Sequence, residues 1–390
     1  MKLNKYSLFI YLICTLLLST LLQTKILFNL NRILGFMLFF LILSYVVERK
    51  KKSDFYILCF SILSVTISFG ITTNISTNLS NSIYWLLAIW LIRVSEDVDF
   101  QNKMILALNR EQRIIRMTII MADLILIYSL FSGVGYKVSY LERFFVGFTA
   151  HQHTLASAAC FIICLVLVDI CITSQYKKVK FPVMPFIFLL PALIAVLQSS
   201  ARIFLLTAGI LLVYIYLYLI EDISLKTLIL PIAILLMGNL FMNSNVFERM
   251  INISGSNSNA YTSGRLEFWA ADINAFLNSN IIHKIFGHGF EYVQIINKEL
   301  TSVAIGAHND YITLLLGLGL FGMLIYVSVL INEFKSTFML KSIIKVAMLF
   351  VFWFVPSFIN GFYGYQLLLY SYIIFKLLVL RDSNLSLESI

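Results

Sequence analysis

Three arginines and one histidine are the residues of this 390-residue chain that best suit chemistry on a charged substrate. Arg202 and Arg265 each carry a planar guanidinium, which can bind a phosphate group through two parallel hydrogen bonds. Arg143 has the same chemistry, although it can also pair with the adjacent Glu142. His308 ionises near neutral pH and can therefore accept a proton. These residue types indicate a site that binds an anion and moves a proton.

Each of these residues also has an ordinary structural interpretation, which the sequence leaves open. Arg202 follows Gln198-Ser199-Ser200-Ala201 at the start of an apolar run, where a long side chain can reach the membrane–water interface. Arg265 can pair with Glu267 two residues later. Taken alone, a histidine such as His308 is more often structural than catalytic.

The residues around the histidines predict a helix cap and argue against a metal site. Asn309 or Asp310 can cap the apolar helix that begins there. His151 and His153 are two residues apart, lie on different faces of a helix and have no carboxylate pair beside them. The chain also has no glycine-rich phosphate loop and no GxSxG pattern. We therefore predict no metal ligands and no cofactor.

The composition indicates whether most of the chain lies in water or in lipid. Hydrophobic residues make up 60% of the chain and charged residues 13%, with a mean hydropathy of +0.89. A soluble fold of this size cannot hide so much apolar surface, which excludes a soluble enzyme, a nucleic-acid-binding module and a disordered chain. The apolar runs are continuous rather than alternating. They predict an all-α polytopic membrane protein, residues 1–390 forming a single integral membrane domain.

About twelve apolar runs are long enough to cross a bilayer, at roughly 20 residues for each crossing. They are 6–23, 30–47, 55–71, 82–94, 114–133, 154–173, 182–199, 201–220, 227–242, 310–330, 343–360 and 364–380.

The net charge of +9 reflects topology, because lysine and arginine cluster in short loops. With the N-terminus in the cytoplasm, 20 of the 29 basic residues fall on the cytoplasmic side. Both termini are therefore expected in the cytoplasm, and the candidate arginines are among the few basic residues on the outside.

Two outer segments stand apart from the short loops. Residues 134–153 form one loop, and residues 243–309 form a long periplasmic or extracellular loop of the kind that usually carries function. The long loop opens with the Ser/Asn-rich stretch Asn252–Asn259. Ser263 can then cap a helix in which Leu266, Trp269, Ile273 and Phe276 recur at helical spacing. This stripe predicts a helix lying on the outer membrane surface, followed by a turn at Gly287-His288-Gly289.

Five motifs follow one another along the chain: the Ser-Ser-Ala-Arg run ending at Arg202, Gly264-Arg265-Leu266-Glu267-Phe268-Trp269, Phe286-Gly287-His288-Gly289-Phe290, His308-Asn309-Asp310-Tyr311-Ile312 and Leu316-Gly317-Leu318-Gly319-Leu320-Phe321-Gly322. In this order, the motifs resemble those of the superfamily of O-antigen ligases and Wzy-type polysaccharide polymerases, which are integral-membrane glycosyltransferases of the GT-C class. The resemblance covers roughly residues 140–330. In the family, a Ser or Thr often precedes the first arginine, where this chain has Ala201.

The resemblance implies metal-independent glycosyl transfer on the outer face of the bacterial cytoplasmic membrane. The donor would be an oligosaccharide on undecaprenyl diphosphate, and the acceptor a sugar hydroxyl. Arg202, Arg265, Arg143 and Asn309 would bind the substrate, and His308 would act as the base. A chain-length regulator is a candidate partner, and nucleic acid is not.

Three other functions remain to be weighed against a polysaccharide polymerase that builds O-antigen or capsule. An O-antigen ligase would transfer the glycan to a lipid A core or a protein; the His-Asn-Asp-Tyr and Phe-Gly-His-Gly-Phe motifs favour a polymerase. A twelve-span transporter or flippase should place polar groups at mid-membrane, where this chain has only Asp123. A non-catalytic scaffold would not need three arginines and a histidine around one loop.

Overall fold

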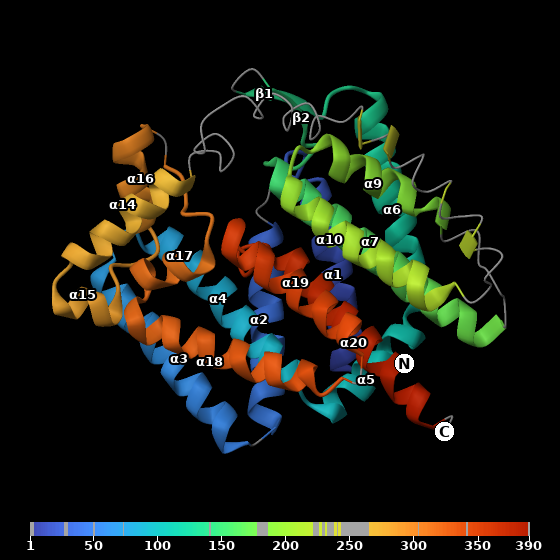
Figure 1. Cartoon of the computed structure of the whole chain (residues 1–390), viewed down its shortest axis with the longest axis horizontal. Helices are drawn as coiled ribbons and strands as arrows, with labels where there is room; N and C mark the ends of the chain where they lie inside the picture. The colour runs from blue at the N-terminus through green and yellow to red at the C-terminus, as the bar shows by residue number, and fades with distance from the viewer. Residues whose placement is uncertain are drawn as a thin grey trace. The chain divides into compact units, whose positions relative to one another are not determined.

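The computed structural model is almost entirely helical (Figure 1). It describes residues 4–26, 30–49, 51–72, 74–139, 142–177, 186–220, 226–227, 231, 238–239, 241–242, 265–302, 304–340 and 342–388. These residues divide into two compact units. The first unit comprises those within 1–37, 102–255 and 370–390, and the second comprises those within 38–101 and 256–369.

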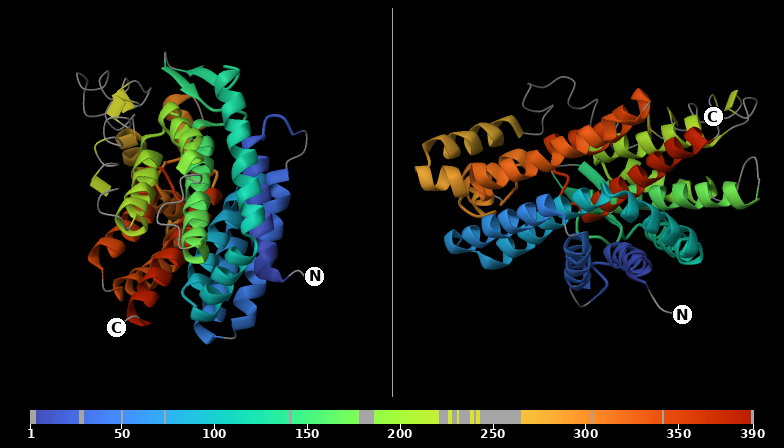
Figure 2. Two further views of the ribbon diagram at one scale, coloured as in Figure 1. Left: turned by 90° about the vertical axis from the view of Figure 1, so that its right-hand side faces the viewer. Right: turned by 90° about the horizontal axis from the view of Figure 1, so that it is seen from below.

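The first unit is built around one helix that is apolar on all sides. Every residue of α7 from Leu155 to Ile170 is buried, and α7 packs against α1, α6, α9 and α10 (Figures 1 and 2). Ala156, Ala158 and Ala159 lie in its buried length, and such small residues let neighbouring helices approach closely. The elements of the unit are α1 (Lys5–Leu21), the start of α2 (Leu30–Arg49), most of α5 (Val98–Arg110), α6 (Gln112–Phe131), β1 (Tyr136–Ser139), β2 (Glu142–Phe145), α7 (Gln152–Lys177), α9 (Leu189–Gln198), α10 (Arg202–Tyr214), the π-helix η1 (Ile215–Leu219) and most of α20 (Gln366–Glu388).

The second unit joins long apolar helices to a group of shorter ones. Within it α18 packs against α3, α4, α15, α17 and α19. Its elements are the end of α2, α3 (Lys52–Ile71), α4 (Ile75–Ser95), α14 (Arg265–Asn278), α15 (Ile281–Phe286), α16 (Tyr292–Thr301), α17 (Asp310–Gly317), α18 (Gly319–Phe338) and α19 (Ile343–Ile359).

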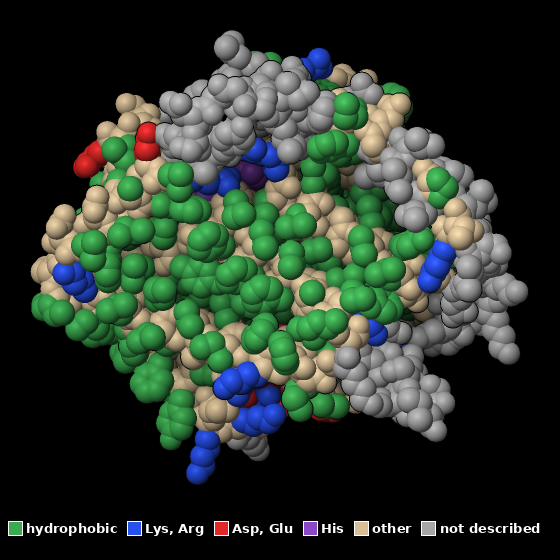
Figure 3. Space-filling model, in the orientation of Figure 1, with side chains coloured by type: hydrophobic (Ala, Val, Ile, Leu, Met, Phe, Trp, Pro, Cys, Tyr) green, Lys and Arg blue, Asp and Glu red, His purple; other side chains and the backbone are tan. Residues whose placement is uncertain are grey.

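Among the described residues, seven helices are long and apolar enough to cross a membrane. Shorter apolar helices are α1, α9 and α19. Hydrophobic side chains cover the face that carries α18 and α19 (Figure 3), where Leu324 is 65% exposed and Ile343 70% exposed. Such a surface suits lipid rather than water, and the predicted all-α polytopic membrane fold is confirmed. The seven are residues 30–49, 52–71, 75–95, 112–131, 152–173, 202–219 and 319–338.

Helices overlap eleven of the twelve predicted spans, although some bounds and connections differ. The short predicted span 82–94 is the apolar part of α4, which begins seven residues earlier under a cap from Asn74. The structure also adds α5 and an antiparallel hairpin that pairs Tyr136 with Phe145, where only loops were predicted. Most of the predicted span 227–242, the stretch Asn252–Asn259 and Ser263 lie outside the described residues.

The predicted span 310–330 is wrong in one respect, because two helices take its place. The break falls at Leu318, and Gly319 has a left-handed backbone (φ +68°). The turn at Gly287 fits into the break: its neighbours His288 and Gly289 donate backbone hydrogen bonds to Leu316 (2.8 Å) and to Gly317. A Cβ on Gly319 would overlap the carbonyl of residue 285. The apolar run is unbroken through this site, so hydropathy alone joins the two helices.

Candidate functional site

The three short helices α14, α16 and α17 of the second unit enclose a small apolar core of their own. Its buried members are Val293, Ala307, Ile312 and Leu316, and side chains from α14 pack against them. Trp269 of α14 also donates an Nε1 hydrogen bond to the carbonyl of Ala307 (2.7 Å). The segment just before α17 is therefore fixed to α14.

The predicted helix through Leu266 and Phe276 is confirmed as α14, although its apolar residues divide between two faces. Trp269 and Phe276 pack on the α16–α17 core, whereas Leu266 and Ile273 are 46% and 43% exposed. The second pair leaves an apolar face for the predicted contact with the membrane surface, which stays a prediction.

A buried carboxylate lies on the core side of α14. Asp272 has no exposed surface, and burial raises its pKa to about 7, while a hydrogen bond from Asn297 of α16 acts in the opposite direction. Asn297 in turn donates from Nδ2 to the carbonyl of Ile305 (3.1 Å). The side chain that holds the α16–α17 connection is thus Asn297, and burial disfavours the ionised form of Asp272 beside it.

His308 lies in that connection, two residues before α17. Its backbone is left-handed (φ +53°), which is uncommon for a residue with a side chain, and its ring is half-buried. Asn309 then caps α17, because its Oδ1 accepts a hydrogen bond from the backbone N–H of Ile312 (3.1 Å). The predicted cap is confirmed for Asn309, whose contact with substrate stays a prediction.

Asp310 is the residue of this site whose importance the sequence does not reveal. Its Oδ2 accepts hydrogen bonds from Ser357 Oγ (2.5 Å), from the backbone N–H of Phe362 (2.8 Å) and, at longer range, from Tyr363 N (3.4 Å) and Tyr326 Oη (3.5 Å). Asp310 is 3% exposed. It joins the start of α17 to α18, to α19 and to the segment that follows α19.

Arg265 approaches the same segment from α14. Its Nη1 donates to the carbonyl of Ile359 (2.7 Å), and its Nη2 to Oδ1 of Asn360 (3.4 Å). These acceptors lie at the C-terminal end of α19, where a cation is favoured by the helix dipole. The segment 359–363 therefore contacts both side chains. Ile359 and Asn360 accept hydrogen bonds from Arg265, and the backbone N–H groups of Phe362 and Tyr363 donate hydrogen bonds to Asp310. The structure thus brings Arg265 and the His308–Asp310 segment to one place in the second unit.

The predicted turn around His288 is confirmed and carries a stack of rings. The rings of His283 and His288 are parallel with centroids 4.0 Å apart, and Tyr292 stacks on the other side of His288 at 3.9 Å. His288 Nε2 lies 2.8 Å from Ser279 Oγ. Burial and the nearby His283 lower the pKa of His288 to about 4. His288 is therefore neutral at physiological pH and too weak a base for the role that we predict for His308.

Arg202 and Arg143 lie in the first unit. Arg202 is the first residue of α10 and follows a tight turn in which Ser200 is left-handed (φ +58°). The Oγ of Ser199 accepts the backbone N–H of Ala201 (3.2 Å) within that turn. Arg143 lies on β2, with its guanidinium 4.3 Å from the centroid of the Tyr136 ring. That geometry is a cation–π contact, which supplies Arg143 with a structural partner.

The predicted loop 134–153 also places its two histidines together. The rings of His151 and His153 have centroids 5.0 Å apart, and burial together with Lys137 lowers the pKa of His151. Within the part of the chain that the structure describes, no three His, Cys, Asp or Glu side chains gather into a possible metal site. A metal-independent reaction stays a prediction.

One comparison with known proteins matches this site. Residues 186–327 match a family model described as O-antigen ligase. The match runs from just before α9 into α18 and contains Arg202, Arg265, His308 and Asn309, whereas Arg143 precedes it. No match was found among curated proteins or among solved structures.

Proposed function

We propose, from the match of residues 186–327 to the O-antigen ligase family model, that this membrane protein is a glycosyltransferase acting on lipid-linked glycans. The donor in this proposal is an oligosaccharide repeat unit on undecaprenyl diphosphate. The reaction takes place on the outer face of the cytoplasmic membrane, with both chain termini in the cytoplasm as the distribution of basic residues favours. The observation that carries the proposal is the attachment of Arg265 and of the His308–Asp310 segment to the same residues, 359–363.

In the proposed reaction, a hydroxyl oxygen of the acceptor sugar attacks the anomeric carbon of the donor sugar. The bond from that carbon to the diphosphate oxygen breaks, and the diphosphate leaves with the electron pair. Arg265 and Arg202 donate charge-assisted hydrogen bonds to the leaving diphosphate. Neutral His308 accepts the proton of the attacking hydroxyl. Asn309 and Arg143 are the remaining candidate substrate contacts.

We favour a polymerase, in which the acceptor is the terminal sugar of a second lipid-linked glycan. The His308-Asn309-Asp310-Tyr311 and Phe286–Phe290 motifs support this choice by their resemblance to polymerases. The alternative is an O-antigen ligase that transfers the glycan to a lipid A core or a protein. The family match supports both reactions equally.

The test supplies the purified protein in lipid vesicles with lipid-linked repeat units and separates the products by length. We expect a ladder of longer glycans from the wild-type protein, also in the presence of EDTA, because arginines rather than a metal stabilise the diphosphate. His308→Ala should abolish the ladder without changing Tm. His151→Ala is the matched control, since His151 is a histidine of the other predicted outer loop, and it should leave the ladder intact.

Two results would change the proposal. A normal ladder from His308→Ala would remove His308 from catalysis. A wild-type protein that makes no ladder but attaches the glycan to a lipid A core would replace the polymerase with the ligase, while the enzyme class would stand.

A further inference from the structure

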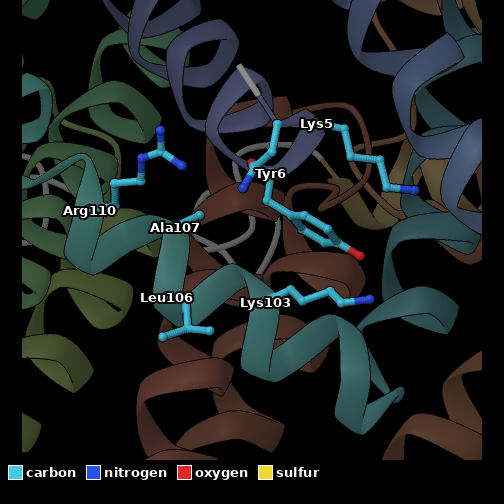
Figure 4. Close-up of a pocket in the computed structure, with 7 residues that line it drawn as sticks. Lys5, Tyr6, Lys103, Leu106, Ala107 and Arg110 are labelled. Atoms are coloured by element: carbon cyan, nitrogen blue, oxygen red, sulfur yellow. The ribbon is translucent and has the colours of Figure 1, made fainter. Parts of the chain in front are cut away.

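A cavity at the opposite end of the first unit from its hairpin has a basic lining that the proposed reaction does not use. It lies between the start of α1 and α5, with a volume of about 370 Å³ (Figure 4). That volume falls in the range of about 300–1,000 Å³ that small-ligand sites occupy. Its lining residues are Asn4, Lys5, Tyr6, Lys103, Leu106, Ala107 and Arg110.

Three of the lining side chains are cationic. The Nζ atoms of Lys5 and Lys103 lie 5.7 Å and 6.0 Å from the centroid of the Tyr6 ring, and both ammonium groups point past the same end of that ring (Figure 4). Arg110 lies on the other side of Tyr6 and pairs with Glu111 (Nε–Oε1 3.5 Å). Among the described residues, no acidic side chain lines the cavity. The described lining therefore contains three cationic side chains, of which Arg110 is paired with Glu111.

The neighbouring helices place this cavity at the boundary of the membrane. Lys5 is the first residue of the apolar helix α1. α5 connects α4 to α6, which are both long enough to span the bilayer, and only one or two residues separate it from each. α5 therefore has to lie along the membrane surface, and its Leu106 is 66% exposed beside the cavity. This combination of basic and exposed apolar residues is typical of a helix at the lipid headgroups.

We propose that this cavity binds the phosphate headgroup of an anionic phospholipid. Lys5 and Lys103 would bind the phosphate oxygens, and Leu106 would contact the first part of the acyl chains. Basic pockets between helices at the membrane surface are the usual sites for such headgroups. The exposed leucine favours a lipid over a soluble phosphate compound, since a soluble anion has no apolar part for it to contact. This inference does not depend on the proposed glycosyl transfer.

The experiment titrates the purified full-length protein in detergent with short-chain phosphatidylglycerol, phosphatidylcholine and glycerol phosphate, and measures bound molecules by native mass spectrometry. We expect phosphatidylglycerol to bind in preference to the other two. Lys5→Gln/Lys103→Gln should weaken that binding about tenfold or more, since each basic residue near an anionic headgroup contributes several-fold to affinity. The single variant Lys103→Gln should weaken it by a smaller factor, and because Lys103 is exposed it tests the site if the double variant fails to fold.

The matched control is Lys52→Gln/Lys335→Gln, which removes two exposed lysines from the same predicted side of the membrane and should leave binding unchanged. Equal weakening by the control would mean that phosphatidylglycerol is held by diffuse charge, and the cavity would not be a site. Equal binding of phosphatidylcholine would remove the preference for an anion. Binding of glycerol phosphate as tight as that of the lipid would assign the cavity to a soluble anion and overturn the lipid.

Discussion

The two helices that carry Arg202 and the His308 segment begin in similar ways but are held differently. α10 follows a left-handed Ser200, and α17 follows a left-handed His308. The N-cap of α10 is Ala201, which offers no side-chain hydrogen bond, so the turn depends on its own Ser199. The start of α17 is instead bound by side chains and backbone groups of several other elements.

The two helices differ in the contacts that fix the residues at their N-terminal ends. At α10 neighbouring residues supply the backbone hydrogen bonds of the turn, and α7 contacts the next residues through Cys160, whose Sγ donates to the carbonyl of Phe204 (3.4 Å). At α17 the start is fixed from a distance by Trp269, through Ala307, and by Ser357 and Phe362, through Asp310. A base that must lie within hydrogen-bond reach of a substrate hydroxyl benefits from the second arrangement. The following predictions test this contrast.

The largest effect is expected for Asp310→Ala. Removing the acceptor takes away the hydrogen bond of the buried backbone N–H of Phe362 and the 2.5 Å bond from Ser357, whose Oγ keeps only Tyr326 Oη at 3.0 Å. Each hydrogen bond lost from a buried group costs about 1–3 kcal/mol. Thermal unfolding should show a loss of about 3 kcal/mol or more, and the glycan ladder should disappear. Ser199→Ala is the matched change at α10 and should cost only about 1 kcal/mol, for the single hydrogen bond that Ser199 accepts from Ala201. Equal losses in the two variants would refute the contrast.

Lysine in place of arginine should reduce activity while keeping the fold. In Arg265→Lys, one ammonium cannot reproduce the fork that reaches both Ile359 and Asn360, and in Arg202→Lys the bidentate phosphate contact is lost. We expect ladder formation to fall about tenfold or more in each. Arg143→Lys should have the weakest effect, about twofold, because lysine also forms cation–π contacts with tyrosine. A fall in Arg143→Lys equal to the other two would place Arg143 among the principal diphosphate contacts.

Asn309→Ala separates the cap from substrate binding. Losing the hydrogen bond to Ile312 should cost about 1 kcal/mol and lower Tm by a few degrees. The ladder should be weakened only in proportion, and Asn309→Asp, which keeps an acceptor, should restore Tm. Loss of the ladder at unchanged Tm would instead show that Asn309 contacts the glycan or its diphosphate.

The last stability effect concerns the pH dependence of the second unit. Because burial raises the pKa of Asp272 to about 7 from its ordinary 3.8, the folded state binds a proton more tightly than the unfolded state. The ionised carboxylate therefore costs stability that grows as pH rises from about 4 to 7. Asp272→Asn should raise Tm by several degrees at pH 8 and hardly at all at pH 4, as differential scanning fluorimetry would show.

Activity should have the opposite pH dependence, because His308 must be neutral to accept a proton. The ladder should weaken as pH falls below about 6.5, the ordinary pKa of histidine. An activity that instead falls as pH rises would mean that His308 acts as a cation on the diphosphate.

A Tm gain from Asp272→Asn that is independent of pH would remove Asp272 as the source of the pH-dependent stability.

The sequence predicts the membrane helices well because their main signal is local, a run of about 20 apolar residues. It also predicts a cap at Asn309 or Asp310 and the turn at Gly287, which depend on nearby residues. The Asp310 network could not be predicted, because Ser357 and Phe362 are about fifty residues away in the chain. The burial of Asp272 is hidden for a similar reason, since a charged residue on a helix predicts exposure. The break at Leu318 depends on contacts with the turn at Gly287, about thirty residues earlier in the chain. A hydropathy profile contains no information on such contacts.

The shared core of α14, α16 and α17 constrains the order in which the protein can be made. Trp269 and Phe276 are synthesised before Ile312 and Leu316, against which they pack. The long loop must therefore leave the ribosome and reach its final compartment with its aromatic side chains uncovered until α17 follows. A chain that stops within residues 302–309 would lack the partners that bury them and would present an aggregation-prone surface. Synthesis of α17 is thus the step that completes the core shared by α14, α16 and α17.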